Sequence, residues 1–241
     1  MTGPAAAPAG AAARVPRPAA AGLVPLSRVS LFDGLPAARI AWLEARLPIV
    51  RWIFGTPRPA ELVVRDRLFV VREGRLALFE RAVSGHQVMI AVLDAGAIYS
   101  TLGDVEAPGL DALEDLAVSP IPGPALAALA AREPLLARNV AEAFSERVAM
   151  LRATAAVLAE IRVEDRLLAR VLQLADEFGT ATPSGALLDL GLTHAQWGLL
   201  VGAARESVTL ALGRLRAQGE LVVEGRGITV PWRVARRGQP R

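Results

Sequence analysis

Short apolar runs separated by turn residues occupy the first half of the chain, from residue 49 to residue 122. The runs are rich in Val, Ile, Leu and Phe, and Gly or Pro separates them. Many short strands with regularly spaced turns are typical of a small β-sandwich or barrel. The predicted strands are Ile49–Phe54, Leu68–Val71, Leu76–Phe79, Val88–Leu93 and Leu116–Ile121, and a short helix is predicted before them at Ala37–Leu47.

Helical spacing replaces the strand pattern from Ala125 onward. Between Glu133 and Ile161, small and apolar residues recur at alternating spacings of four and three, which is a heptad repeat. One interpretation is a core helix that packs only on its own barrel. At ~1.5 Å per residue, however, the helix spans about 42 Å, which favours pairing with a second copy. The residues expected at this dimer interface are Ala137, Ala141, Phe144, Val148, Leu151, Ala155 and Leu158.

A helix–turn–helix pattern followed by a hairpin occupies Leu192–Val230. Thr193 is a suitable N-cap for a helix from His194 to Leu200, and Gly202 supplies the turn. A second helix is expected from about Ala204 to Ala217, with inward residues at helical spacing. Its predicted inward residues are Val208, Ala211, Leu212 and Leu215. A hairpin around residues 224–227 completes a winged helix–turn–helix, which we expect to bind DNA.

The exposed first turn of the second helix carries the candidate base contacts. Arg pairs bidentately with guanine, and Glu accepts from the cytosine amino group, so Arg205 and Glu206 are expected to read base edges. Ser207 and Thr209 are expected to contact bases or phosphates. Backbone positioning is assigned to Thr193 and Gln196, with Arg226 of the wing in support. Two such helices in a dimer would read a palindromic operator with half-sites ~34 Å apart.

The residues Gly202-Ala203-Ala204-Arg205-Glu206-Ser207-Val208 resemble the G-x-S-R-E-[ST]-V signature of the Crp/Fnr family of bacterial transcription regulators. Residues 68–76 and Leu93-Asp94-Ala95-Gly96 are similar to turns of that family's sensor domain. The resemblance spans roughly residues 27–233. It implies an α+β chain with an N-terminal cyclic-nucleotide-binding-like β-barrel (a double-stranded β-helix), a long dimerisation helix and a C-terminal winged helix–turn–helix.

The sensor departs from the cyclic-nucleotide-binding members of the family. Tyr99-Ser100 stands where those members have a Gly-Glu pair for the ribose, and Asp111 lies in the segment that carries their phosphate-binding Arg. A cyclic phosphate needs a cation or amide donors rather than a carboxylate, so we expect no response to cyclic AMP. His86 is the only sensor histidine and lies in a predicted hairpin tip, where an exposed side chain is expected rather than a haem ligand.

The amino-acid composition limits the metal sites, cofactors and partners that the chain could have. The chain has 241 residues and no cysteine, which excludes disulfides, thiolate zinc sites and Cys-ligated iron–sulfur clusters. Its two histidines make a cupin-like metalloenzyme an unfavourable alternative. Residues 181–241 carry a net charge of +4, whereas residues 31–180 carry −4, and a basic C-terminal part on an acidic body favours a polyanion-binding module.

The sequence therefore predicts a cytoplasmic, non-enzymatic homodimer that binds double-stranded DNA, with RNA polymerase as a candidate partner. No cofactor and no signal peptide are expected. No membrane contact is expected either, because the longest uncharged stretch in the body, Leu116–Ala131, carries three prolines. The effector stays unknown, and a non-sensing barrel regulated by abundance alone is a further alternative. The expected division is a disordered tail at 1–25, the sensor at 26–132, the dimerisation helix at 133–161, the winged domain at 162–233 and a basic tail at 234–241.

Overall fold

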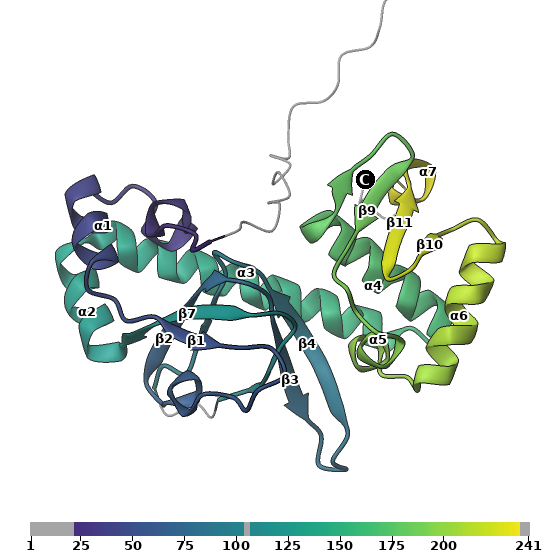
Figure 1. The fold of residues 1–241 in the computed structure, drawn as a ribbon, viewed down its shortest axis with the longest axis horizontal. Coiled ribbons are helices and arrows are strands. Elements are labelled where there is room, and N and C mark those ends of the chain that lie inside the picture. Colours follow the sequence, from purple (N-terminus) through teal and green to yellow (C-terminus); the bar gives the residue numbers. More distant parts are fainter. Residues whose placement is uncertain (1–21, 104–106, 237–241) are drawn as a thin grey trace, which may run out of the picture.

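A computed structural model describes residues 22–103 and 107–236. The strands of the sensor domain and those of the C-terminal domain form separate sheets, and one long helix, α3 (Pro134–Ala159), connects the two parts (Figure 1). The mixed α+β class with an N-terminal β-domain and a C-terminal helix–turn–helix is confirmed.

Two antiparallel sheets form the sensor domain, with strand orders β1-β7-β2-β5 and β4-β3-β6. Their strands are β1 (Val50–Trp52), β2 (Arg67–Glu73), β3 (Leu76–Arg81), β4 (Gln87–Leu93), β5 (Ile98–Ser100), β6 (Gly109–Ala112) and β7 (Leu116–Pro122). The five predicted strands are all present, whereas β5 and β6 are too short to stand out as apolar runs. The sheets face each other across a core that includes Trp52, Phe69, Leu78 and Leu93.

Strand β2 is covered on both faces, which explains its unbroken apolar run. Phe69 and Val71 face the core between the sheets. Leu68 and Val70 face a second core, formed with α1 (Ala37–Glu44), α2 (Gly123–Arg132) and the start of α3. Strands buried on both faces read as continuous rather than alternating hydrophobic sequence.

The folded part begins earlier than the sequence predicts. Val24 is 5% exposed, its N–H donates to the Arg72 carbonyl at 2.7 Å, and its own carbonyl accepts from Arg72 Nε at 2.7 Å. The boundary at residue 26 is therefore too late. Residues 1–21 and 237–241, which carry most of the two predicted tails, lie outside the described residues.

The described part of the C-terminal domain combines four helices with a four-stranded sheet of order β10-β11-β9-β8. Its elements are α4 (Val163–Phe178), β8 (Thr180–Ala181), β9 (Gly185–Leu188), α5 (His194–Val201), α6 (Arg205–Ala217), β10 (Val222–Glu224), β11 (Gly227–Pro231) and α7 (Trp232–Ala235), and the C-terminal turns of α3 pack against α4. The Gly, Pro and Ser residues at 178–185 are typical of a loop, but β8 lies within this segment, and β9, which starts at its end, pairs with β11. These short strands are hidden in the sequence because the wing supplies their partner.

The two domains share one apolar core. Phe79 and Met89 of the sensor hairpin belong to the same buried cluster as Trp197, Leu200 and the rest of the helix–turn–helix core. Among the described residues, no helix is both long enough and apolar enough to cross a membrane.

Candidate DNA interface and ligand cavity

The first helix of the motif, α5, is anchored by a capping box. Thr193 Oγ1 accepts from the Gln196 N–H at 3.2 Å, and Gln196 Oε1 accepts from the Thr193 N–H at 2.8 Å. Such reciprocal bonds satisfy two donors that a helix start leaves unpaired. Gly202 ends α5 with a φ of +60°, a conformation that glycine adopts without strain. Thr193 and Gln196, which the sequence analysis assigns to the DNA backbone, therefore also hold the start of α5 in place.

The second helix, α6, presents the predicted base-reading residues to solvent. Its predicted inward residues Val208, Ala211, Leu212 and Leu215 are all buried. Arg205, Glu206 and Thr209 are exposed, and Ser207 is half-buried. In Figure 1, α6 lies at the edge of the molecule away from the sensor strands, so its outer face is accessible.

A groove of about 430 Å³ runs between α5, α6 and the wing. Arg205 of α6 and Arg226 of the wing both line it, and His194 lies beside them at the start of α5. Arg226 is exposed in the turn between β10 and β11 and donates to the Gly191 carbonyl at 3.4 Å. The structure thus brings the residues of three separated segments to one cationic surface, which suits a phosphate backbone.

One member of this surface is missing from the predicted set. His194 Nδ1 lies 2.8 Å from Thr209 Oγ1, and Thr209 Oγ1 donates to the Arg205 carbonyl at 3.0 Å. Sequence reasoning places His194 at a helix start but has no means of pairing it with a residue fifteen positions away.

The predicted dimer seam lies on an unpaired face of α3. Ala137, Ala141, Val148, Leu151 and Ala155 are exposed, and Phe144 and Leu158 are half-buried. Val148 and Leu151 keep 56% and 40% of their surface accessible, which is unusual for large apolar side chains at helical spacing. Phe144 differs from the others because it also packs on the second sensor core.

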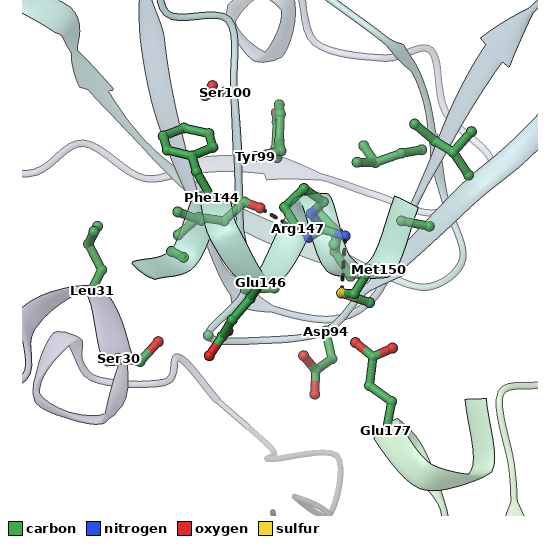
Figure 2. Close-up of a pocket in the computed structure, with 18 of the residues that line it drawn as sticks. Ser30, Leu31, Asp94, Tyr99, Ser100, Phe144, Glu146, Arg147, Met150 and Glu177 are labelled. Atoms are coloured by element: carbon green, nitrogen blue, oxygen red, sulfur yellow. Dashed lines mark hydrogen bonds between the residues drawn. The ribbon is translucent and has the colours of Figure 1, made fainter. Parts of the chain in front are cut away.

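The sensor contains a cavity of about 470 Å³ (Figure 2). Strands β4 and β5 form one wall with Ile90 and Ile98, α3 forms another with Phe144 and Arg147, and the end of α4 adds Phe178. The cavity is therefore built by the sensor, the long helix and the first helix of the C-terminal domain together. Sequence reasoning leaves the effector site open, because no single segment carries it.

Charged side chains of both signs line this cavity. Its lining includes four carboxylates, Glu80, Asp94, Glu146 and Glu177, against two guanidinium groups, Arg28 and Arg147. Arg147 donates to the Ile98 carbonyl at 3.4 Å and contacts Met150 Sδ at 3.8 Å. Burial lowers the pKa of Arg147, and the negative charges of Glu177 and Glu146 oppose that shift.

Four sensor residues singled out in the sequence take different positions. Tyr99 is buried and stacks on Phe69 with 4.4 Å between ring centroids, while Ser100 lines the cavity. Asp111 is exposed on β6 and is not part of the cavity lining. His86 is exposed in the turn between β3 and β4, as predicted. Within the described ranges, no group of three or more His, Asp or Glu residues could hold a metal ion.

Comparison with known proteins identifies the C-terminal domain first. Residues 165–234 match the Crp-like helix-turn-helix domain. A CRP-like cAMP-activated global transcriptional regulator of Mycobacterium tuberculosis is 27% identical over 221 residues, covering 89% of this chain and 98% of the relative. A global nitrogen regulator of Synechococcus elongatus is 25% identical over 85% of this chain and 92% of the relative.

Solved structures share the fold at lower identity. CooA from Carboxydothermus hydrogenoformans superposes with a TM-score of 0.68 at 21% identity, covering 79% of this chain and 87% of that one. A CRP/FNR-family regulator from Thermus thermophilus gives a TM-score of 0.60 at 21% identity, over 79% of this chain and 97% of that one. The domain match, the full-length relatives and the shared architecture agree. Residues 165–234 are thus a Crp-like helix-turn-helix domain, and over most of its length the chain is similar in sequence and in fold to bacterial transcription regulators of the Crp/Fnr family.

Proposed function

We propose that this regulator binds a palindromic operator as a homodimer and that cyclic AMP is not its effector. The observation that carries the DNA contact is the exposed first turn of α6 beside a wing arginine and a capped α5. In this assignment the protein acts without catalysis, in the cytoplasm, with RNA polymerase as a further partner.

The exposed residues of the motif divide into two roles. Arg205 and Glu206 read base edges, because their side chains leave the first turn of α6 without a bond that ties them to the protein fold. Ser207 contacts bases or phosphates. Thr209 contacts a base donor, because its only proton is used on the Arg205 carbonyl and a phosphate oxygen has no proton to give. Thr193, Gln196 and Arg226 hold the phosphate backbone.

The exposed stripe of α3 supports pairing of two copies. Two helices joined along the stripe from Ala137 to Leu158 would remove its apolar side chains from water and place two winged domains side by side. A two-fold arrangement requires an operator with two inverted half-sites, ~34 Å apart.

Two features of the sensor argue against cyclic AMP. The buried Tyr99 ring stacks on Phe69 and its hydroxyl donates to the Leu62 carbonyl, so it offers no donor to a ribose or phosphate in the cavity. The segment that carries the phosphate-binding Arg in cyclic-nucleotide-binding members of the family carries the carboxylate of Asp111 here. The Mycobacterium tuberculosis relative is described as cAMP-activated, so this property is expected to differ between the two proteins.

Base reading and phosphate binding can be separated by two substitutions. Arg205→Ala should cost ~1–3 kcal/mol per half-site on the operator and little on scrambled duplex, because a bidentate base contact carries sequence information. Arg226→Ala should weaken both duplexes alike and reduce the salt slope by about one unit for each phosphate that the protein no longer neutralises.

The measurement is a fluorescence titration of operator and scrambled duplexes across a salt series, with the operator obtained by in vitro selection. Equal weakening of both duplexes by Arg205→Ala would mean that Arg205 holds phosphate only.

Calorimetric titration with cyclic AMP tests the sensor assignment, and micromolar affinity would refute it. Operator affinity is also measured before and after small molecules are removed from the purified protein. A change in affinity would exclude the alternative of a non-sensing barrel regulated by abundance alone.

A further inference from the structure

A short chain of hydrogen bonds ties the start of α5 to the first turns of α6. His194 Nδ1 lies 2.8 Å from Thr209 Oγ1, and Thr209 Oγ1 lies 3.0 Å from the Arg205 carbonyl oxygen. His194 is half-buried and lines the groove between the motif and the wing, so this chain sits at the surface assigned to DNA.

Counting protons along this chain determines the tautomer of His194. A threonine hydroxyl has one proton, and Thr209 donates it to the Arg205 carbonyl, which has none to give. The bond between His194 and Thr209 must therefore take its proton from the imidazole. Nδ1 carries a proton, and the neutral ring keeps only a lone pair on Nε2.

In this tautomer, Nε2 can donate a hydrogen bond only when the ring is protonated. A lone pair on Nε2 of the neutral ring repels a phosphate oxygen. Protonation turns the same atom into an N–H donor on a positively charged ring, and charge-assisted bonds to phosphate are the strong ones. Imidazoles change charge between about pH 5 and 8.

The charged groups around His194 link this change to DNA. Arg205 of α6 and Arg226 of the wing line the same groove, so a phosphate that these two arginines bind would lie beside the His194 ring. The nearest carboxylates along these elements, Glu206 and Glu224, are not part of the groove lining, and α5 itself carries no other charged side chain. Phosphates bound by the two arginines would reverse the local charge and favour protonation.

We propose that His194 is a proton-dependent phosphate contact, so that this regulator takes up protons when it binds DNA and binds more tightly as the pH falls. The inference rests on the proposed DNA interface. It adds a residue to that interface and makes operator affinity sensitive to pH near neutrality.

The composition makes this proposal testable, because few other groups titrate in the same range. The chain has two histidines and no cysteine. His86, the other histidine, lies in the exposed turn between β3 and β4 of the sensor, so it serves as the matched control.

The experiment measures affinity of untagged protein for operator duplex from pH 8 to pH 6 at constant ionic strength. Wild-type affinity should rise about tenfold for the dimer, or roughly threefold per histidine. His194→Ala should be flat at the weaker level, His194→Arg flat at the tighter level, and His86→Ala should behave as the wild type. Nitrogen-15 shifts of His194 should report a protonated Nδ1 in the neutral ring.

The outcomes separate this inference from the function on which it rests. Normal operator binding that does not change between pH 8 and pH 6, or a full pH response in His194→Ala, would overturn the His194 contact alone. Failure of the wild type to prefer operator over scrambled duplex would overturn the proposed interface and the contact together.

Discussion

Tyr99 shows how one buried side chain can make the whole fold sensitive to pH. It is the single tyrosine of the chain, it is 5% exposed, and its hydroxyl donates to the Leu62 carbonyl at 3.1 Å. Burial raises the pKa of Tyr99 well above that of an ordinary tyrosine, and the charge of Arg58 offsets only part of the shift. The folded protein therefore keeps this proton under conditions in which the unfolded chain releases it.

Stability should fall as the pH rises above about 10, the ordinary tyrosine value. The unfolded chain ionises there while the fold retains the proton, so this residue alone contributes a loss of about 1.4 kcal/mol per pH unit. Urea unfolding at pH 9, 10 and 11 measures the loss, and Tyr99→Phe should flatten it. Phenolate absorbance in the folded protein near pH 10 would show that the hydroxyl is not buried in solution.

Buried arginines are the residues that sequence reasoning missed most clearly. Arg72 is 1% exposed, bonded to the Val24 carbonyl and to Ser119 Oγ and paired with Glu44. It falls at the register shift of β2 between Val71 and Glu73, a β-bulge. A bulge redirects the side chains beside it, and the local pattern of apolar and polar residues does not indicate where a bulge will occur. A charged residue beside a turn glycine is therefore expected at the surface, and here it is not.

At the scale of elements, α3 has two faces with different tasks. Leu136 and Val157 are buried against the body of the molecule, whereas Val148 and Leu151 remain exposed. The heptad spacing marks a stripe along this helix, and five of its seven members are exposed. Only the tertiary structure shows that Phe144 belongs partly to the sensor core and is a poor probe of the interface.

If two copies pair along α3 as proposed, Val148→Asp combined with Leu151→Asp should give a monomer that still folds. Both side chains are exposed in the single chain, so the charges cost little there, but at a two-fold seam they would be buried without partners. Light scattering measures the mass. Val83→Asp, at a fully exposed hairpin position, is the control. A double variant that stays dimeric would show that the dimer interface does not lie on this face of α3.

The start of α6 offers a gain of stability. Ala204 holds the N-cap position with an extended backbone and no side-chain bond to the helix. Ala204→Ser should supply that bond and raise the free energy of unfolding by ~1 kcal/mol. Ala195→Ser, at an exposed position inside α5, should give no gain. Urea unfolding compares the variants, and equal curves would show that the helix start gains nothing from the hydroxyl.

At the scale of the whole molecule, the DNA-binding domain is docked on the sensor. Arg170 of α4 is 5% exposed and donates to Thr154 Oγ1 of α3 at 2.8 Å and to the Ile90 carbonyl of β4 at 3.3 Å. Ile90 falls at the register shift between β3 and β4, so a bulge directs its carbonyl to the other domain. Burial lowers the pKa of Arg170, and Glu177 opposes that shift.

Arg170→Met should loosen this contact. The substitution keeps much of the apolar volume but leaves the Thr154 hydroxyl and the Ile90 carbonyl without their donor, which should cost ~2 kcal/mol of unfolding free energy. Amide hydrogen exchange in β4 and α4 should become faster. Arg152→Met on the exposed face of α3 is the matched control, and unchanged exchange in Arg170→Met would show that the arginine does not hold the domains together.

The docked arrangement also explains why the ligand cavity is invisible in the sequence. Its lining joins strands β4 and β5, the middle of α3 and the end of α4, which are separated by up to about ninety residues. A ligand there would touch the DNA-binding domain through Glu177 and Phe178, so its binding can depend on how that domain is placed.

Local sequence patterns were enough to establish most of the elements, the family resemblance and the exposed face of α6. Period-two and heptad spacing, caps and turn glycines act over a few residues, so they can be read along the chain. The cavity, the buried Arg72 and Arg170, the pairing of His194 with Thr209 and the strands beside the wing emerge only in the folded molecule. These features depend on contacts between distant segments and on bulges that redirect single residues, and neither leaves a periodic pattern in the sequence.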